Sequence, residues 1–352
     1  MTRELPVDIA KGLGILLVVA GHTLAAWESG HESLHRFIYS FHMPLFLGIS
    51  GRYISTAQSF REFIATKAAR IIVPFLFWTL VYFIFEHVKD TLKMMAGSTN
   101  SFLPLLDDNE LVALVHIPLY ANWTALNSAG VFVDLWFLPA LFSMVIIMRV
   151  LVICATDIHP GFMFLVTMVP SYLMTELSSS FGMHPLAIWG IDIAIAALPF
   201  VYLFRLRHFI YSQSILILLP LILTTWYFSK DTDVAMATLT VSNYPKFLIA
   251  ACTGIAVILL LSKKLETSPL GSVLSKFGQR SYAIYVTSGI VGYLVGTLTK
   301  FPFLGTGDMA NTVKCTLVLA STYFLYPLIG SSNYLRMLAL GEPFPSKALK
   351  QG

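Results

Sequence analysis

The sequence predicts an all-α polytopic membrane protein, a bundle of about ten transmembrane helices with both termini in the cytoplasm. The chain has 352 residues, of which 56% are hydrophobic and only 12% are charged, whereas soluble domains carry about 25% charged residues. Apolar segments long enough to cross a hydrocarbon core recur along its whole length. Lysine and arginine gather on alternate connecting segments, which sets the orientation in the membrane.

Ten apolar segments are predicted as spans. They cover residues 7–27, 37–54, 71–88, 131–154, 161–177, 186–204, 212–228, 244–262, 281–299 and 312–330. A shorter apolar segment at 110–123 is flanked by prolines and acidic residues, so we expect it to be re-entrant or interfacial. Residues 1–335 are expected to form one transmembrane domain, and residues 336–352 a short cytoplasmic tail.

Charge and cysteine content narrow the function classes. With the N-terminus inside, most of the 23 lysine and arginine residues fall on cytoplasmic segments. The net charge of +4 gives no reason to expect a nucleic-acid partner. Cys154, Cys252 and Cys315 are far apart and lack metal or redox spacing. We therefore expect no metal site.

The first span carries three polar side chains, Asp8, Lys11 and His22. A charge at the bilayer centre costs roughly 2.5–3.5 kcal/mol on insertion scales. At about 100° per residue, the three lie within about 60° of one helix face, and Lys11 to His22 covers roughly 16 Å. The stripe is expected to face a cavity inside the bundle. The spacing leaves open a plain interfacial ion pair and a satisfied buried histidine.

Two further polar groups follow in the second and third spans. His42 precedes Pro44 within an apolar run, where it either caps irregular backbone or lines the same cavity as His22. Lys67 and Arg70 share one helix face just before the third span. They either anchor that span by the positive-inside rule or bind an anionic ligand such as a nucleotide phosphate.

Later polar residues are more scattered. Asp134 and Trp136 lie near the start of the fourth span. Aromatic residues are common at the membrane interface, which explains Trp136. Asp134 is either an interfacial residue or a buried carboxylate that orients a histidine or binds sugar hydroxyls. Arg280 lies at the start of the ninth span, where it either caps the helix end or contacts a ligand. Residues 161–262 are poor in charge and are interpreted as scaffold. Asp192 is the exception, an intramembrane carboxylate without an evident partner.

Several motifs together resemble the membrane acyltransferase-3 family. They are VDIAKGLGILLVVAGH, FHMPLFLGISG, KAARIIVPFLFW, DLWFLPALF and SYAIY, in that order. The branch they are most similar to is that of fucose 4-O-acetylase-like and exopolysaccharide O-acetyltransferases. The resemblance covers essentially the whole chain and implies a multi-pass protein of the bacterial inner membrane.

The resemblance implies roles for particular residues. The basic residue and the histidine of the family's first helix match Lys11 and His22, and the cytoplasmic basic pair matches Lys67 and Arg70. Lysine stands where arginine is common at two of these positions, so the bidentate fork is missing there. Many members have a histidine shortly after the SYAIY-like motif, where this chain has Thr287-Ser288; no role carries over.

The family activity is transfer of an acyl group, usually acetyl, from cytoplasmic acyl-CoA to a glycan hydroxyl. We therefore expect acetyl-CoA as donor and co-substrate, and a lipid-linked, outward-facing glycan or exopolysaccharide precursor as acceptor. The polysaccharide-assembly machinery is a candidate partner, alongside membrane lipid. The expected catalytic residues are His22, Lys11 and Asp8. Lys67, Arg70 and Arg280 are expected to hold the CoA phosphates, and His42, Asp134 and Trp136 the acceptor.

Histidine suits the part of base because its ordinary pKa is near 6.5. Asp8 lies about 21 Å from His22 along the helix, so we expect it to pair with Lys11 instead. His22 either deprotonates the hydroxyl directly or carries the acetyl group as an acyl-imidazole. Two other functions stay open: a glycolipid flippase or transporter, and an acetyltransferase for a cytoplasmic sugar precursor.

Overall fold

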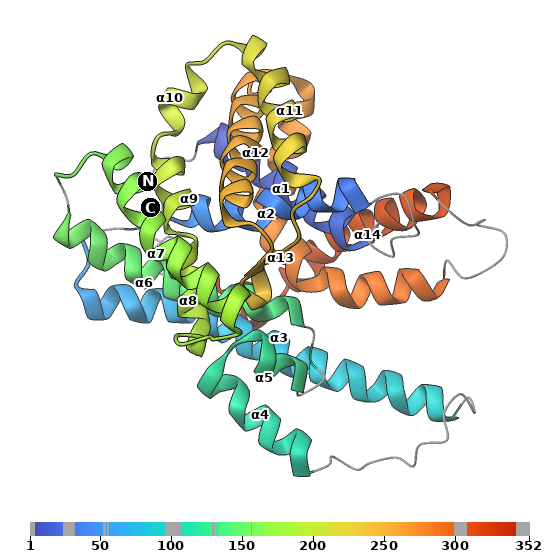
Figure 1. Cartoon of the computed structure of the whole chain (residues 1–352). Coiled ribbons are helices and arrows are strands. Elements are labelled where there is room, and N and C mark those ends of the chain that lie inside the picture. Colours follow the sequence, from blue (N-terminus) through green and yellow to red (C-terminus); the bar gives the residue numbers. More distant parts are fainter. Residues whose placement is uncertain are drawn as a thin grey trace, which may run out of the picture.

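The computed structural model describes residues 4–23, 32–51, 54, 56–95, 108–128, 131, 133–155, 157–298 and 308–342. These residues are almost entirely helical (Figure 1). The longer helices are α1 (Leu5–Thr23), α2 (Glu32–Ser50), α3 (Phe60–Met95), α4 (Asp108–Tyr120), α6 (Phe137–Cys154), α7 (Pro160–Phe181), α11 (Leu218–Ser229), α12 (Tyr244–Lys264), α13 (Pro269–Leu298) and α14 (Asp308–Ile329).

Short elements connect these helices. They are α5 (Trp123–Ser128), η2 (Val133–Trp136), η3 (Ile188–Gly190), α8 (Ile191–Ala196), α9 (Leu198–Arg205), α10 (Arg207–Tyr211), η4 (Ile215–Ile217), η5 (Met236–Thr238) and α15 (Asn333–Leu340). One antiparallel hairpin joins α11 to α12. It pairs β1 (Val234–Ala235) with β2 (Thr240–Val241), and it is the one sheet in the described part of the chain.

The predicted all-α membrane fold is confirmed. Within the described residues, six helices are long and apolar enough to cross a membrane. They lie at Leu5–Thr23, Phe60–Lys93, Asp134–Cys154, Tyr244–Lys264, Pro269–Leu298 and Met309–Ile329. A bent pair of helices makes a seventh if it counts as one span. The total of ten spans, the single domain and the cytoplasmic location of both termini stay predictions. Residues 24–27 of the predicted first span and residues 343–352 of the predicted tail lie outside the described residues.

The predicted span 186–204 is broken. Ile188–Ala196 and Leu198–Arg205 are bent by 52° relative to each other. Pro199 explains the break, because proline has no amide hydrogen to donate and its ring crowds the carbonyl four residues earlier. Helix α9 therefore starts afresh after Ala197, with Pro199 in its first turn. Helix α8 begins after Gly190, whose φ is +60°, and Asp192 is buried in the first turn of α8.

Helix α1 lies at the centre of the bundle, with α2, α12 and α13 around it (Figure 1). Its most extensive packing is with α13. A Cβ atom on Gly12 would lie 2.0 Å from the Leu274 carbonyl oxygen, and one on Gly278 would lie 1.8 Å from the Asp8 carbonyl oxygen. Glycine at both positions therefore lets the two backbones touch. This contact fixes α1, which carries the polar stripe, against α13.

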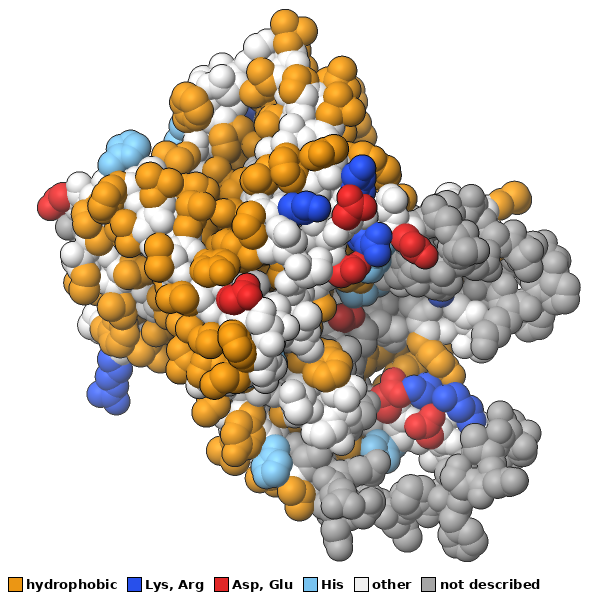
Figure 2. All heavy atoms as spheres, viewed as in Figure 1, with side chains coloured by type: hydrophobic (Ala, Val, Ile, Leu, Met, Phe, Trp, Pro, Cys, Tyr) orange, Lys and Arg blue, Asp and Glu red, His pale blue; other side chains and the backbone are white. Residues whose placement is uncertain are grey.

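The outer surface suits a lipid environment. Hydrophobic side chains cover much of the face seen in Figure 2, and charged side chains are confined to a few groups. In the apolar window of α14 only 11% of the residues are buried inside the protein. Such apolar exposure is unusual for a monomer in water and ordinary for helices in hydrocarbon. The protein is therefore an integral membrane protein.

Candidate functional site

His22 lines a cavity of about 260 Å³ near the C-terminal end of α1, here called the His22 cavity. Helix α2, η2, α13 and the hairpin supply its other walls. The polar and aromatic lining residues are His35, Tyr39, His42, Asp134, Trp136 and Tyr285. The structure thus brings together four predicted site residues, namely His22, His42, Asp134 and Trp136.

The ring of His22 is held through one nitrogen. The Tyr39 hydroxyl lies 3.2 Å from Nδ1, and Oδ2 of Asp134 lies 3.8 Å from the same atom. Within the described residues, no hydrogen bond or ion pair involves Nε2. The backbone of Asp134 is held in place, because the Tyr285 hydroxyl donates a hydrogen bond to the Asp134 backbone carbonyl oxygen. The arrangement orients the imidazole and leaves Nε2 as the nitrogen that can meet a substrate.

Tyr39 stands among three imidazoles. Its ring centroid lies 5.8 Å from that of His22, 3.8 Å from that of His35 and 4.8 Å from that of His42. His42 is buried, and its Nδ1 donates to the Ile38 carbonyl at 2.9 Å, because a carbonyl oxygen only accepts. His42 thus lines the same cavity as His22. The carbonyl it bonds is not the one that Pro44 leaves without a donor, which belongs to Ser40.

A larger cavity of about 500 Å³, here called the inner cavity, runs along the N-terminal half of α1. Its polar lining residues are Glu4, Asp8, Lys11, Ser50, Gln279, Ser281 and Tyr282. The expected pairing of Asp8 with Lys11 is confirmed, with Nζ 3.7 Å from Oδ1. The Tyr282 hydroxyl is buried and has no hydrogen-bond partner among the described residues. Buried hydroxyls rarely stay unpaired, so this atom is a candidate contact for a polar group of a ligand.

The two cavities meet at one constriction. Val18, Met43 and Tyr285 line both of them. The inner cavity extends from there past Lys11, and the His22 cavity extends in the other direction along α1. A third cavity of about 220 Å³, here called the lateral cavity, also contains His22 and Asp134 and lies between α1, α13 and α14. His22 is therefore reached from more than one side.

Three predicted phosphate ligands lie outside the described lining of these cavities. Lys67 and Arg70 are on α3; Arg70 is exposed, and the Lys67 ammonium lies 5.4 Å from the centre of the Phe63 ring. Arg280 donates a hydrogen bond to the Tyr323 backbone carbonyl at 3.0 Å, and its guanidinium lies 3.9 Å from the centre of the Tyr323 ring. Arg280 is thus held on α14, although its neighbours Gln279 and Ser281 line the inner cavity.

Sequence reasoning missed two walls of the site. Tyr39 stands one helical turn before His42 and so shares its face, a spacing that points to the same cavity. The hairpin came from a region interpreted as scaffold, yet residues 234–237 line the His22 cavity. Two-residue strands leave no periodic signal in a sequence.

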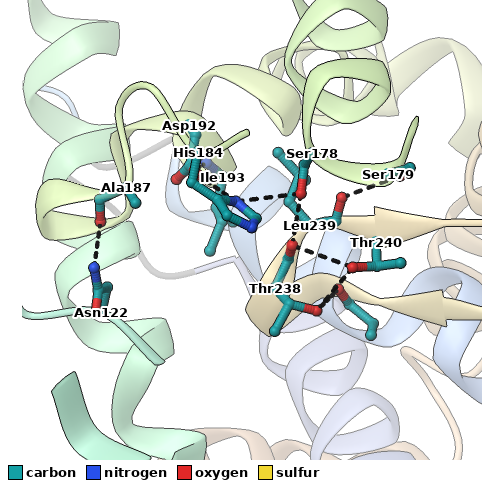
Figure 3. A network of polar contacts seen from close by, with 11 residues as sticks. Asn122, Ser178, Ser179, His184, Ala187, Asp192, Ile193, Thr238, Leu239 and Thr240 are labelled. Atoms are coloured by element: carbon teal, nitrogen blue, oxygen red, sulfur yellow. Dashed lines mark hydrogen bonds and ion pairs between the residues drawn. The ribbon is translucent and has the colours of Figure 1, made fainter. Parts of the chain in front are cut away.

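Asp192 has a partner that its sequence context did not reveal. Oδ2 of Asp192 lies 3.7 Å from Nδ1 of His184, and the Ser178 hydroxyl lies 3.2 Å from the same nitrogen. Figure 3 shows this group beside the hairpin, where Ser178 also donates to the Thr238 carbonyl at 2.8 Å. Both contacts involve the same nitrogen of His184. In a serine-hydrolase triad the serine and the carboxylate bond different nitrogens, so this group is structural and is not a catalytic triad.

No metal centre emerges from the imidazoles. In the described part of the chain, no group of three or more histidine, cysteine, aspartate or glutamate side chains is placed to hold a metal ion. The side chains next to the His22 imidazole are the Asp134 carboxylate and the Tyr39 phenol.

Comparisons with known proteins identify similar chains. Two curated proteins named nodulation protein NolL are similar to parts of the chain. The one from Mesorhizobium japonicum is 40% identical over 93 residues, which is 23% of this chain and 24% of that protein. The one from Sinorhizobium fredii is 36% identical over 89 residues, or 22% and 23% of the two chains. The matches thus span about a quarter of each relative.

No solved structure matches the chain significantly. The acyltransferase domain family, in contrast, matches residues 6–330. That range takes in nearly the whole chain, including the helices that carry His22, Lys11 and Asp134. The chain belongs to this acyltransferase family.

Proposed function

We propose that the protein is a membrane O-acetyltransferase that moves an acetyl group from cytoplasmic acetyl-CoA to a sugar hydroxyl of an outward-facing glycan. One observation carries the proposal: two cavities approach His22 along α1 from opposite directions and share Val18, Met43 and Tyr285. A donor and an acceptor can then meet at one imidazole without passing each other. Family membership supports acyl transfer as the reaction class.

The inner cavity is the proposed donor site. Its mouth carries Lys11, and it runs along the helix towards the constriction. The pantetheine arm, which is uncharged and partly apolar, would lie between α1 and α13. The unpaired Tyr282 hydroxyl is placed to hydrogen-bond an amide or the thioester oxygen of that arm.

The CoA phosphates would stay at the cytoplasmic end. Lys67 and Arg70 are the proposed ligands, because both are near that end of α3 and one of them is exposed. Arg280 is a weaker candidate for this task, because its bond to the Tyr323 carbonyl would have to be exchanged for a phosphate. Lys11, paired with Asp8, is proposed to contribute positive charge further along the cavity.

The proposed chemistry is a direct transfer. Nε2 of His22 accepts the proton of the sugar hydroxyl while the hydroxyl oxygen attacks the thioester carbonyl carbon. The tetrahedral intermediate then collapses: the carbon–sulfur bond breaks, the carbon–oxygen ester bond remains, and His22 returns its proton to the CoA thiolate. Asp134 and Tyr39 act through Nδ1, where a carboxylate stabilises the imidazolium that forms.

The test uses membranes with purified protein and radiolabelled acetyl-CoA. Label should reach a glycan fraction with the wild-type protein and stay absent with His22→Ala. Wild-type rates from the histidine variant would overturn the proposed mechanism. No label from either protein, with acceptor glycan present, would instead favour a transporter.

The same assay without acceptor separates the two routes. In direct transfer the protein stays unlabelled when acetyl-CoA alone is added. Label retained on His22 after rapid quenching would establish an acyl-imidazole, in which the imidazole nitrogen replaces sulfur before the sugar oxygen attacks.

A further inference from the structure

A polar cavity adjoins the His22 cavity on the side of the hairpin. It has a volume of about 320 Å³ and is here called the hairpin cavity. Its polar lining residues, besides the shared ones, are Arg36, Ser179, Ser180, Asp233, Thr240 and Ser242. His35, Tyr39, Val234 and Ala235 line both cavities. The hairpin cavity and the His22 cavity therefore share a border, built by α2 and β1.

The hairpin that forms this wall is firmly attached to α7. The amide of Val241 donates to the Ser179 hydroxyl at 2.8 Å, and the Ser178 hydroxyl donates to the Thr238 carbonyl at the same distance (Figure 3). At the base of the hairpin, the Asp233 amide donates to the Ser242 hydroxyl at 3.0 Å. These bonds fix both strands, so the cavity is formed before any ligand arrives.

A charge pair lies at the rim of the hairpin cavity. Nε of Arg36 lies 2.8 Å from Oδ1 of Asp233, and Nη1 donates to the Lys230 carbonyl at 3.0 Å. Among the described residues, nothing bonds to Oδ2 of Asp233, whose side chain is 72% exposed. The pair is neutral as a whole, so it favours neither an anion nor a cation. The pair offers Oδ2 of Asp233 as an acceptor. The Thr240 hydroxyl, which lies 3.1 Å from that of Thr238, lines the same cavity.

This chemistry suits a neutral polyol. Carboxylate oxygens accept from hydroxyls, and serine and threonine hydroxyls both donate and accept. The rings of His35 and Tyr39 stack with centroids 3.8 Å apart and planes tilted by 31°, and together they form an aromatic wall of the cavity. Ligand sites typically combine such an aromatic wall with a few converging polar groups.

We propose that the hairpin cavity binds the sugar residue next to the one that is acetylated, so that the preferred acceptor contains at least two sugar residues. The proposal rests on the proposed function. One sugar places its hydroxyl at His22, and its neighbour crosses the rim formed by Tyr39 and Val234 into the hairpin cavity. Asp233 and Thr240 would then bind the hydroxyls of the second sugar.

The experiment compares acceptors of two lengths. Dodecyl glycosides of common hexoses and deoxyhexoses are assayed as acceptors with acetyl-CoA. Each monosaccharide glycoside is compared with two disaccharide glycosides, one that contains the same sugar at its non-reducing end and one that contains it at its reducing end. The wild-type protein should show a kcat/KM about tenfold higher for the better disaccharide, a difference equivalent to one well-made set of hydrogen bonds. Asp233→Asn and Thr240→Leu should remove that preference by raising KM for the disaccharide alone.

Matched controls keep the result interpretable. Asp231→Asn removes an exposed carboxylate two residues from Asp233 that does not line the cavity, and should keep the preference. Unchanged monosaccharide kinetics in both cavity variants would show that the His22 cavity is intact. Equal wild-type activity on both acceptor lengths, or an equal loss on both in the variants, would overturn the proposal. No transfer by the wild-type protein to any acceptor would count against the proposed function itself.

Discussion

At the scale of single residues, the site depends on which nitrogen of His22 is occupied. Tyr39 and Asp134 both approach Nδ1, at 3.2 and 3.8 Å. Since the distance along α1 rules out Asp8 as the orienting group, the carboxylate has to come from another helix. Asp134 supplies it from η2, more than a hundred residues later in the chain. An imidazole positioned this way needs no partner within its own helix.

Replacing His22 by alanine should lower kcat by about 10²–10⁴-fold, the range that a positioned acid–base group contributes. Acetyl-CoA binding should stay near the wild-type level, because His22 does not line the inner cavity. The measurements are acetyl transfer and donor binding on the same protein preparation. His116→Ala, which removes an exposed histidine of α4, is the matched control and should transfer at the wild-type rate.

Replacing Tyr282 by phenylalanine should have opposite effects on stability and on donor use. The variant loses a buried hydroxyl that has no partner within the described part of the chain, an arrangement that costs about 1–3 kcal/mol. Its thermal unfolding midpoint in detergent should therefore rise, while KM for acetyl-CoA should increase. A fall in both the midpoint and the KM would show that the hydroxyl has a different task.

At the scale of elements, the packing of α1 on α13 decides where the polar stripe points. Gly12 and Gly278 bring the two backbones into contact, and the inner cavity opens beside that contact, lined by both helices. The stripe therefore faces protein and cavity rather than lipid. Pro199 has the opposite effect on α8 and α9, since it breaks a span instead of tightening a contact.

Alanine at Gly278 should destabilise the protein strongly. Its Cβ would lie 1.8 Å from the Asp8 carbonyl oxygen, so one helix backbone has to move. Overpacking of this kind costs about 1–3 kcal/mol or more, and the folded yield and the unfolding midpoint should both fall. Gly292→Ala, on the same helix, places its Cβ where no atom lies within 4 Å and should be neutral. Equal behaviour of the two variants would contradict the close contact.

The sequence was sufficient for most elements and for the polar stripe. Each predicted span overlaps helical structure in the described residues, although 186–204 is broken, because long apolar runs leave the backbone few alternatives in hydrocarbon. The pairing of Asp8 with Lys11 followed from helical spacing alone. The hairpin and the contacts of Tyr39 and Asp134 with His22 depend on how distant segments pack, and spacing along one helix carries no information about that.

At the scale of the whole molecule, the proposal depends on sidedness. The inner cavity must open to the cytoplasm, where CoA thioesters are made available, and the His22 and hairpin cavities to the opposite side. Positively charged residues at the expected cytoplasmic ends support this orientation. The ends of α6 and α7 provide two exposed positions with which to test it.

A membrane-impermeant maleimide should distinguish those two positions in intact cells. Cys154, exposed at the end of α6, is expected inside, and Ser180→Cys, exposed at the end of α7, is expected outside. With the other cysteines replaced by serine, only the residue at position 180 should react until the cells are opened. Labelling of Cys154 in intact cells would reverse the orientation and place the acceptor in the cytoplasm.

The constriction at Val18, Met43 and Tyr285 also bears on the energy supply of the cell. A membrane potential of 100 mV drives each elementary charge with about 2.3 kcal/mol, and a water-filled path between the two cavities would short-circuit it. The three side chains are nearly buried, and narrow apolar passages of this kind exclude water and therefore ions. An acetyl group is uncharged once it leaves CoA. In the proposed reaction, these three side chains would keep ions from passing between the two cavities.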